Sequence, residues 1–404
     1  MAKLSIRDLD LAHKHVFMRV DFNVPLSDDG SEITDDTRIR ETLPTLEYAL
    51  RHKAKLILAS HLGRPKGKVN PKYSLRPVVD RLRILLDHHL GEQVNVAFSP
   101  DCVGELATEL SRQLESGQVL LLENLRFHAE EEANDPRFAS QLASLCDLYV
   151  NDAFGSAHRA HASTEGITHH VKVAAAGLLM EKELAYMGKA LEEPAKPFVA
   201  ILGGAKVSDK IEVIDNLLNK VDAILIGGGM AYTFLKAKGQ DIGKSLLEAE
   251  KIDVANEALA KAEAKGVRFL LPVDHVLANK FAGDAKTQIF EGDGPFPAEW
   301  MALDIGPKTV ELFSKEIADA STIVWNGPMG VFELPAFAVG TTKIAKAVAA
   351  NQDAISIVGG GDSVSAVAKA GVADKITHIS TGGGASLEFL EGKKLPGVEA
   401  LTDK

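Results

Sequence analysis

Cysteine is scarce in this sequence: Cys102 and Cys146 are the only two among 404 residues. They form neither a CxxC pair nor another spacing typical of metal ligands, so a disulfide framework is excluded and a reducing compartment is favoured. The first ten residues, MAKLSIRDLD, contain no apolar stretch of the kind found in secretion signals. We therefore expect a cytoplasmic protein.

Long apolar runs and an excess of positive charge are also missing. The longest apolar runs, such as VAAAGLLM at 173–180, fall far short of the roughly 20 residues that a membrane span requires. Acidic residues (56) outnumber lysines and arginines (45), which gives a net charge of −11. We expect a monomer that binds neither membranes nor nucleic acid, and any anion site must be a local basic patch.

Short apolar runs rich in β-branched residues are frequent, and stretches of helix length separate them. This alternation is typical of parallel sheets covered by helices on both faces. With six runs in each half, the sequence predicts an α/β protein of two doubly wound, Rossmann-like domains. The predicted strands are 16–20, 54–60, 94–98, 119–124, 148–152 and 171–176 in the first half, and 198–204, 223–229, 267–273, 321–327, 354–361 and 376–381 in the second.

The length of the chain also favours two domains, each large enough to bury a core. Between the halves, apolar residues recur at helical spacing from Met180 to Leu191, and Pro194 ends the pattern. This pattern predicts one interdomain helix. The predicted division is an N-terminal domain over 1–177, a helix and linker over 178–197, a C-terminal domain over 198–390, and a tail over 391–404 that packs back on the first domain.

Cationic and polar side chains follow the predicted strands of the first half, where open α/β sheets bind ligands. Arginine binds phosphate and carboxylate with two parallel hydrogen bonds. A single arginine would be interpreted as a solvated surface charge, but several in equivalent places favour an anion site. The residues concerned are Asp21, Asn23, His61, Arg64, Arg126, His158 and Arg159, with Arg38 joining from the first helix.

Glycine clusters follow the predicted strands of the second half, at 203–204, 227–229, 327–330, 359–361 and 382–384. Without Cβ atoms, such loops can turn backbone N–H groups toward phosphate oxygens, and a following helix dipole adds to the attraction. GGGDS at 359–363 opens a predicted helix. Asp362 or Ser363 can be an N-cap there, or Asp362 can face Mg²⁺.

Lys206 and Lys210 lie four residues apart at a predicted helix start, so we expect them to share one face. Cations at a helix N-terminus oppose the helix dipole unless an anion compensates, which favours a functional role.

Three other segments resemble known functional motifs but do not match them. GQDIGKS at 239–245 is one residue short of a phosphate-binding P-loop, no glycine cluster has the GxGxxG spacing of dehydrogenases, and HRAH at 158–161 is not a zinc-protease motif.

Nine segments together resemble the phosphoglycerate kinase family, in the order in which that family has them. The resemblance spans nearly the whole chain, and the motifs are long and specific. One departure is Ser363, where the family often has threonine; the hydroxyl is kept. The segments are RVDFNVP (19–25), SHLGRP (60–65), ENLRF (123–127), NDAFGSAHRAHAS (151–163), GGAKVSDK (203–210), GGGMA (227–231), WNGPMGVFE (325–333), GGGDS (359–363) and STGGGAS (380–386).

The resemblance implies reversible transfer of the acyl phosphate of 1,3-bisphosphoglycerate to MgADP, which gives 3-phosphoglycerate and MgATP. It implies that the first domain binds phosphoglycerate and the second binds ATP or ADP with Mg²⁺. The implied phosphoglycerate ligands are Asp21, Asn23, Arg38, His61, Arg64, Arg126 and Arg159. The implied nucleotide ligands are Lys206, Lys210, Gly227, Gly228, Asn326, Glu333 (on the ribose), Gly360, Gly361, Asp362 (on Mg²⁺) and Ser363.

Phosphoryl transfer requires positioning and charge neutralisation more than covalent chemistry. We predict a clamp formed by Arg38, Lys206, Lys210 and the N–H groups of Gly361 and Gly383. Because the reacting atoms must come within about 3 to 3.5 Å, we also expect a hinge and a central cleft between the domains. Two alternatives stay open: a nucleotide enzyme of another chemistry, such as a dehydrogenase, and a non-catalytic descendant that has kept the fold.

Overall fold

A computed structural model describes residues 2–292 and 294–404 of the chain. The chain divides into two compact units, Met1–Ala185 with Lys394–Lys404, and Tyr186–Lys393. Among the described residues, no helix is both long enough and apolar enough to cross a membrane.

The first unit is built on a six-stranded parallel sheet with the strand order β3-β4-β2-β1-β5-β6. Its strands are short and almost wholly buried, as expected for a sheet that is covered on both faces. All six overlap the runs predicted from the sequence, although β1 begins one residue before its run and β3 ends one residue after its run. They are β1 (His15–Arg19), β2 (Lys55–Ala59), β3 (Val96–Ser99), β4 (Val119–Leu122), β5 (Leu148–Asn151) and β6 (Ala174–Ala176).

Helices α1 (Thr37–Arg51) and α2 (Arg76–Leu90) cover one face of this sheet, where their leucines join Val16, Met18 and Leu56 in one core. The alternate residues, such as Phe17 and Tyr149, are buried as well, so the second face is also covered. The other helical segments of this unit are η1 (Ile6–Asp8), η2 (Pro71–Tyr73), α3 (Gly104–Gln113), η3 (Leu125–Phe127), α4 (Ala129–Glu132), α5 (Pro136–Ala143), η4 (Phe154–Ser156), η5 (Gly166–His170) and α14 (Pro396–Glu399).

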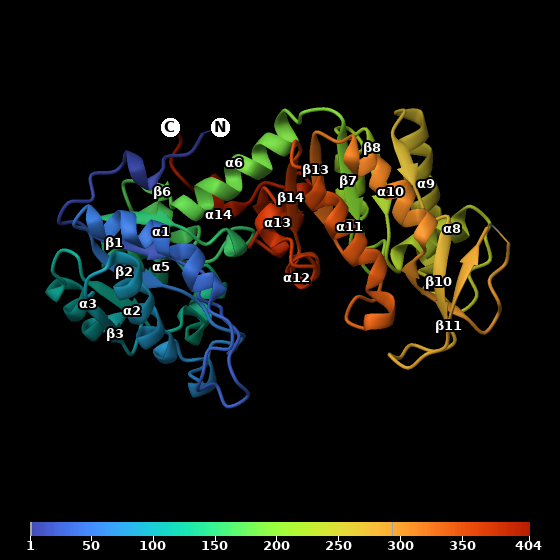
Figure 1. Cartoon of the computed structure of the whole chain (residues 1–404). Coiled ribbons are helices and arrows are strands. Elements are labelled where there is room, and N and C mark those ends of the chain that lie inside the picture. The colour runs from blue at the N-terminus through green and yellow to red at the C-terminus, as the bar shows by residue number, and fades with distance from the viewer. Residues whose placement is uncertain (1, 293) are drawn as a thin grey trace. The chain divides into compact units, whose positions relative to one another are not determined.

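The two ends of the chain pair with each other in the first unit, and Figure 1 shows N and C close together. The Leu4 N–H donates to the Thr402 carbonyl at 2.8 Å, and the Thr402 N–H donates to Ala174 at 2.9 Å. Helix α6 (Leu178–Glu192) runs from this unit into the other one. Its start is held by buried Asp152, whose carboxylate accepts the N–H groups of Leu179 and Met180.

The second unit has a six-stranded parallel sheet with the order β15-β14-β13-β7-β8-β9. Each strand lies within a run predicted from the sequence, so the predicted fold class is confirmed. The strands are β7 (Phe198–Leu202), β8 (Ala223–Ile226), β9 (Arg268–Leu270), β13 (Thr322–Asn326), β14 (Ile355–Gly359) and β15 (His378–Ile379).

Side chains of alternate strand residues enter two separate cores. Phe198 and Ala200 pack in the core that includes α7, α8 and α9, whereas Val199 and Ile201 pack in the core that includes α10, α11 and α12. The helical segments are α7 (Ile211–Leu217), α8 (Met230–Ala237), η6 (Ala249–Lys251), α9 (Ile252–Ala264), α10 (Pro307–Ala318), η7 (Pro335–Phe337), α11 (Val339–Ala350), α12 (Gly361–Lys369), η8 (Ala373–Lys375) and α13 (Gly384–Leu390).

A three-stranded antiparallel sheet was not predicted from the sequence. It consists of β10 (Asp274–Ala278), β11 (Thr287–Glu291) and β12 (Met301–Ile305), with β10 in the middle. Polar and acidic residues interrupt the apolar pattern of these strands: β10 reads DHVLA, β12 reads MALDI, and β11 reads TQIFE and is largely exposed. Antiparallel strands with one solvated face need no continuous apolar run.

Candidate functional site

In the first unit, the carboxyl end of the sheet is organised around a fully buried arginine, Arg19, the last residue of β1. Its Nη2 donates to Nδ1 of His61 at 2.9 Å, and its Nε donates to the hydroxyl of Ser163, also at 2.9 Å. Glu131, which is likewise buried, accepts from the Ser163 hydroxyl at 2.5 Å and from the Ser163 N–H at 3.0 Å. This network links three loops beneath the surface of the site.

The electrostatics of this edge are strongly cationic. Burial, followed by the charges of Arg19, Arg126 and Arg38, holds the pKa of His61 well below its usual value. Burial and the charges of Arg126, Arg19 and Arg159 lower the pKa of His161 to about 4. Both imidazoles are therefore neutral at pH 7, and the arginines act on a common region.

Several predicted phosphoglycerate ligands are held by one another or by neighbouring loops. Arg38, at the start of α1, donates to the carboxylate of Asp21 at 2.7 Å. The Asn23 side-chain oxygen accepts from the Gly63 N–H at 2.9 Å, and Arg126 donates to the Gly63 carbonyl at 3.0 Å. The loop after β2 is thus tied to the loops after β1 and β4.

The two remaining arginines of this set are exposed. Arg64 directly follows the loop residue Gly63, which Asn23 and Arg126 hold. Arg159 lies after β5, donates to Nε2 of His158 at 3.1 Å, and lowers the pKa of His161. All seven predicted residues therefore lie on or beside loops that follow the strands or on the first turn of α1.

Three residues at this edge were missed by sequence reasoning: Arg19, Glu131 and His161. Arg19 and His161 belong to motifs quoted above, RVDFNVP and NDAFGSAHRAHAS. Arg19 is the last but one residue of the predicted strand 16–20, and His161 follows the predicted strand 148–152. That position was the available signal. No feature of the sequence indicated that Glu131 is buried, because a glutamate within EEE at 130–132 is expected to be solvated.

In the second unit, two glycine loops pack against each other where β7 and β13 end. A Cβ atom on Gly203 would lie 2.1 Å from the Pro328 carbonyl, and one on Gly327 would lie 2.2 Å from the Gly203 carbonyl. Gly327 also has a φ of +101°, which other residues rarely adopt. These glycines are therefore required for backbone packing, which brings both loops to one edge.

A hollow of about 650 Å³ lies at this edge. Among the predicted nucleotide ligands, it is lined by Lys206, Lys210, Asn326, Gly360, Gly361, Asp362 and Ser363. Lys210 donates a hydrogen bond to the Asn326 side-chain oxygen. Burial lowers the pKa of Lys210, and nearby Asp209, Glu391 and Asp362 oppose that shift.

Two local expectations about this hollow are wrong. Lys206 and Lys210 do not share a helix face, because α7 begins at Ile211 and both lysines precede it. The N-cap of α12 is Gly360, with a φ of +88°, so neither Asp362 nor Ser363 is the cap. Asp362 is exposed in the first helical turn, and the buried Ser363 hydroxyl accepts from the Gly327 N–H at 2.6 Å.

A second hollow of about 400 Å³ adjoins the first, because Gly204, Ala205, Pro328 and Asp362 line both. Gly228 and Glu333 from the predicted set line it. Its apolar wall was not predicted from the sequence, and it includes Leu246, Phe281, Met301, Leu303 and Val331.

Gly227 and Gly383 are not among the described residues that line either hollow. A Cβ on Gly227 would meet the Met329 sulfur at 2.4 Å, so its glycine is explained by packing. Gly383 precedes the short helix α13 as its N-cap, with a φ of +51°.

An α/β scaffold that brings paired lysines, glycine loops and a carboxylate around one hollow is typical of enzymes that bind nucleotide phosphates. The chain is a phosphotransferase of this class. It belongs to the phosphoglycerate kinase family, whose model matches residues 6–393. The enzyme class and family predicted from the sequence are therefore confirmed, and the chain has phosphoglycerate kinase activity.

The similarity extends over the whole chain. Phosphoglycerate kinases of Acidobacterium capsulatum and Koribacter versatilis are 84% and 74% identical to it, and the matches cover 100% of each protein. The structure of phosphoglycerate kinase from Coxiella burnetii is 44% identical and superposes with a TM-score of 0.88 over 98% of both chains. A dehydrogenase is therefore excluded.

Proposed function

We propose that the two substrates of the transfer reaction, the phosphoglycerate and the nucleotide, bind to different units. The first unit, predicted as 1–177 with the tail 391–404, binds 3-phosphoglycerate or 1,3-bisphosphoglycerate. The second, predicted as 198–390, binds ATP or ADP, and 178–197 connects them. The observation that carries this proposal is the contrast in chemistry between the two strand edges: several arginines near His61 and His161 on one, and glycine backbone with two lysines on the other.

On the first unit, the arginines supply charge-assisted hydrogen bonds to the phosphate and carboxylate groups of the three-carbon substrate. Asp21 and Asn23 add polar contacts, and neutral His61 can accept or donate one hydrogen bond without adding charge. Arg19 and Glu131 act as positioning residues, because their network lies beneath the ligand side chains. The proposed ligands are Asp21, Asn23, Arg38, His61, Arg64, Arg126 and Arg159.

On the second unit, the phosphates of the nucleotide occupy the larger hollow and its base occupies the smaller one. The apolar wall formed by Leu246, Leu303 and Val331 suits the faces of a purine ring. Glu333, exposed at the same hollow, is suited to accept hydrogen bonds from ribose hydroxyls. The other proposed ligands are Lys206, Lys210, Gly227, Gly228, Asn326, Gly360, Gly361, Asp362 and Ser363.

Mg²⁺ fits this donor set. In nucleotide sites Mg²⁺ takes one or two carboxylates, phosphate oxygens and water. Asp362 is exposed and lines both hollows. Its carboxylate can therefore reach an ion bound to the nucleotide, and it stays hydrated while the site is empty. When bound, Mg²⁺ would neutralise part of the phosphate charge.

The chain itself contributes positioning and charge to the transfer. In the direction that consumes ATP, the carboxylate of 3-phosphoglycerate is already ionised at neutral pH, so no general base is needed. The negative charge on the migrating phosphoryl group is stabilised by Arg38, Lys206 and Lys210 and by the N–H groups of Gly361 and Gly383. Lys210 is pre-oriented by its bond to Asn326.

The two ligand sets come from different units, so we further propose that the enzyme closes to work. The hinge lies at the ends of α6 and near Gly382–Gly384. Closure brings the reacting atoms within about 3 to 3.5 Å and keeps water away from the acyl phosphate. We also propose that the protein is a cytoplasmic monomer. The two unpaired cysteines support a reducing compartment, and the net charge of −11 supports a lack of affinity for nucleic acid.

Binding of each ligand alone tests the division between the units. Arg159→Ala and Lys206→Ala remove exposed cations, so both variants should fold. Isothermal titration calorimetry should show that Arg159→Ala weakens 3-phosphoglycerate binding by about 10- to 100-fold and leaves ADP binding unchanged. Lys206→Ala should weaken ADP binding and leave 3-phosphoglycerate binding unchanged.

Arg137→Ala and Lys265→Ala serve as matched controls, since each removes an exposed cation from the same unit away from the proposed sites. A variant that weakens both ligands equally, or the ligand assigned to the other unit, would contradict the proposal.

A further inference from the structure

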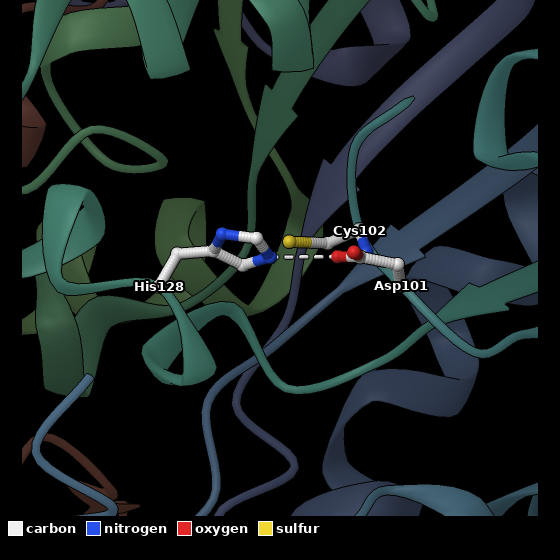
Figure 2. Close-up of side chains that lie close together, drawn as sticks. All are labelled: Asp101, Cys102 and His128. Carbon is white, nitrogen blue, oxygen red and sulfur yellow. Dashed lines mark hydrogen bonds and ion pairs between the residues drawn. The ribbon is translucent and has the colours of Figure 1, made fainter. Parts of the chain in front are cut away.

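A cluster of metal-binding side chains lies in the first unit and plays no part in the proposed transfer reaction. Asp101 and Cys102 are in the turn between β3 and α3, and His128 lies between η3 and α4. Figure 2 shows the three side chains pointing toward one another. Nε2 of His128 lies 2.7 Å from Oδ1 of Asp101, and these atoms and the Cys102 sulfur all lie within 4.8 Å of one another.

The three side chains of the cluster differ in solvent exposure. Cys102 is fully buried, whereas the side chains of His128 and Asp101 are 28% and 50% exposed. The sulfur therefore forms the floor of the cluster, and the carboxylate lies at its solvent side. An ion that enters from solvent would meet the carboxylate and imidazole first and the sulfur last.

The local structure holds these side chains in place. The Asp101 carboxylate also accepts from the Cys102 N–H at 2.7 Å, and the Ser99 hydroxyl donates to the Asp101 carbonyl at 2.6 Å. The His128 ring packs on Phe138, with 5.1 Å between ring centroids. Binding of an ion would therefore require little additional ordering of these side chains.

We propose that Asp101, Cys102 and His128 form a binding site for a divalent transition-metal ion of the Zn²⁺ class. Sulfur, imidazole nitrogen and carboxylate oxygen are together the donors that Zn²⁺ takes, at about 2.3, 2.0 and 2.1 Å. Three protein ligands leave the fourth tetrahedral position to water. Mg²⁺ and Ca²⁺ are disfavoured, because they prefer oxygen ligands alone.

Binding requires modest rearrangement. Ligand atoms around a tetrahedral ion are about 3.4 Å apart at these bond lengths, so the 2.7 Å contact between His128 and Asp101 must widen while the sulfur comes nearer. The partly exposed His128 and Asp101 can make this movement. As the metal–sulfur bond forms, the Cys102 thiol releases its proton to solvent. Nε2 of His128 also gives up the proton that it donates to Asp101, which leaves the neutral Nδ1–H form of the ring and a free lone pair on Nε2 for the ion.

The consequence is a cross-link between two loops. The ion would tie the turn after β3 to the start of α4, two residues beyond Arg126. The alternative interpretation is a surface ion pair between Asp101 and His128 above an inert buried thiol.

The chain contains an internal control. Cys146 is followed by Asp147, whose carboxylate lies 3.5 Å from His15. The same three residue types are thus nearby, yet among the described residues the only such group whose ligand atoms come within 4.8 Å of one another is that of Asp101, Cys102 and His128.

The test uses the reduced, full-length protein without nucleotide, because nucleotides bind divalent ions themselves. Co²⁺ serves as the spectroscopic probe, and Zn²⁺ affinity is measured by competition with a chromogenic chelator. We expect one equivalent of Co²⁺ to give a thiolate-to-cobalt charge-transfer band, which Zn²⁺ abolishes and excess Mg²⁺ does not.

Cys102→Ala should remove the charge-transfer band, and His128→Gln should alter the band. Each should weaken Zn²⁺ binding by more than about 100-fold, since even the loss of an outer-shell partner costs 10- to 100-fold. Cys146→Ala should leave both properties unchanged. His128→Gln alters a partly exposed side chain, so it tests the site even if Cys102→Ala unfolds. Absence of the band in the unmodified protein, or equal loss in Cys146→Ala, would refute the proposal.

Discussion

Arg38 and Asp21 form an ion pair in which a guanidinium nitrogen lies 2.7 Å from a carboxylate oxygen. Arg38 belongs to the first turn of α1, and Asp21 follows β1, so the pair links the helix to the edge of the sheet. The Arg38 side chain is 40% exposed and that of Asp21 13%. We infer that Asp21 orients the guanidinium group while its other N–H donors stay available to a ligand.

From this arrangement we predict that Arg38→Ala lowers turnover by about a hundredfold or more, because the charge clamp on the migrating phosphoryl group is lost. Nucleotide affinity should stay nearly intact, since Arg38 lies in the first unit. Turnover is measured in a coupled assay with 3-phosphoglycerate and MgATP, and ADP affinity is measured by calorimetry.

Arg40→Ala is the matched control, because Arg40 lies two residues further along α1 and pairs with Asp36 instead. Near-normal turnover of Arg38→Ala, or an equal loss in Arg40→Ala, would remove Arg38 from the mechanism.

Asp362→Asn should weaken the binding of MgATP while leaving metal-free ATP binding nearly unchanged or slightly stronger. The reason is that the carboxylate, in its proposed role, binds Mg²⁺ and repels phosphates that carry no metal ion. Because Gly360 is the N-cap of α12, the change should have little effect on the melting temperature. Calorimetric titrations with and without Mg²⁺ measure the difference.

Asp374→Asn, an exposed acid of the same unit outside both hollows, should change neither affinity. If Asp362→Asn and Asp374→Asn bind MgATP alike, Asp362 has no role toward the ion.

Asp304 predicts a pH dependence of stability. Burial raises the pKa of this carboxyl to about 7, against the N–H groups of Gly340 and Ile305 that lower it. Between pH 4 and 7 the folded chain therefore holds a proton that the unfolded chain has lost. The free energy of unfolding should fall as pH rises through this window, by up to about 4 kcal/mol from this group.

Asp304→Asn removes this titration, so the fall in stability between pH 5 and pH 8 should be smaller than in the unmodified protein. Its absolute stability should be lower by about 1–3 kcal/mol, because an amide cannot accept from both N–H groups. Urea unfolding at both pH values gives the difference, and Asp353→Asn controls for an exposed acid. An unchanged difference would show that Asp304 is ionised throughout.

The proposed closure of the enzyme on its two substrates should be measurable in solution. Small-angle scattering should give a smaller radius of gyration with 3-phosphoglycerate and a nucleotide bound together than with either ligand alone, because both are needed for the phosphoryl group to be clamped from two sides. Equal radii in all states, together with full turnover, would contradict the proposed hinge.

Local sequence patterns determined the class of the fold and the places where the proposed ligand residues lie. Apolar runs such as FVAIL and AILI are buried on both faces of a parallel sheet, so the pattern that makes them strands also fixes their environment. Because parallel strands end at one edge, the residues after them, including Arg126 and Asp362, could be assigned to two edges without coordinates.

Tertiary structure decided which side chains meet. Arg19 and Ser163 are 144 residues apart and Asp101 and His128 are 27 apart, so no local pattern pairs them. Burial of Glu131 depends on Arg19 and Ser163, which come from other segments. The antiparallel sheet of β10, β11 and β12 also escaped prediction, because its strands are stabilised by cross-strand pairing and carry no apolar run. Sequence periodicity reports local burial, whereas hydrogen-bond partners and desolvation depend on contacts between distant segments.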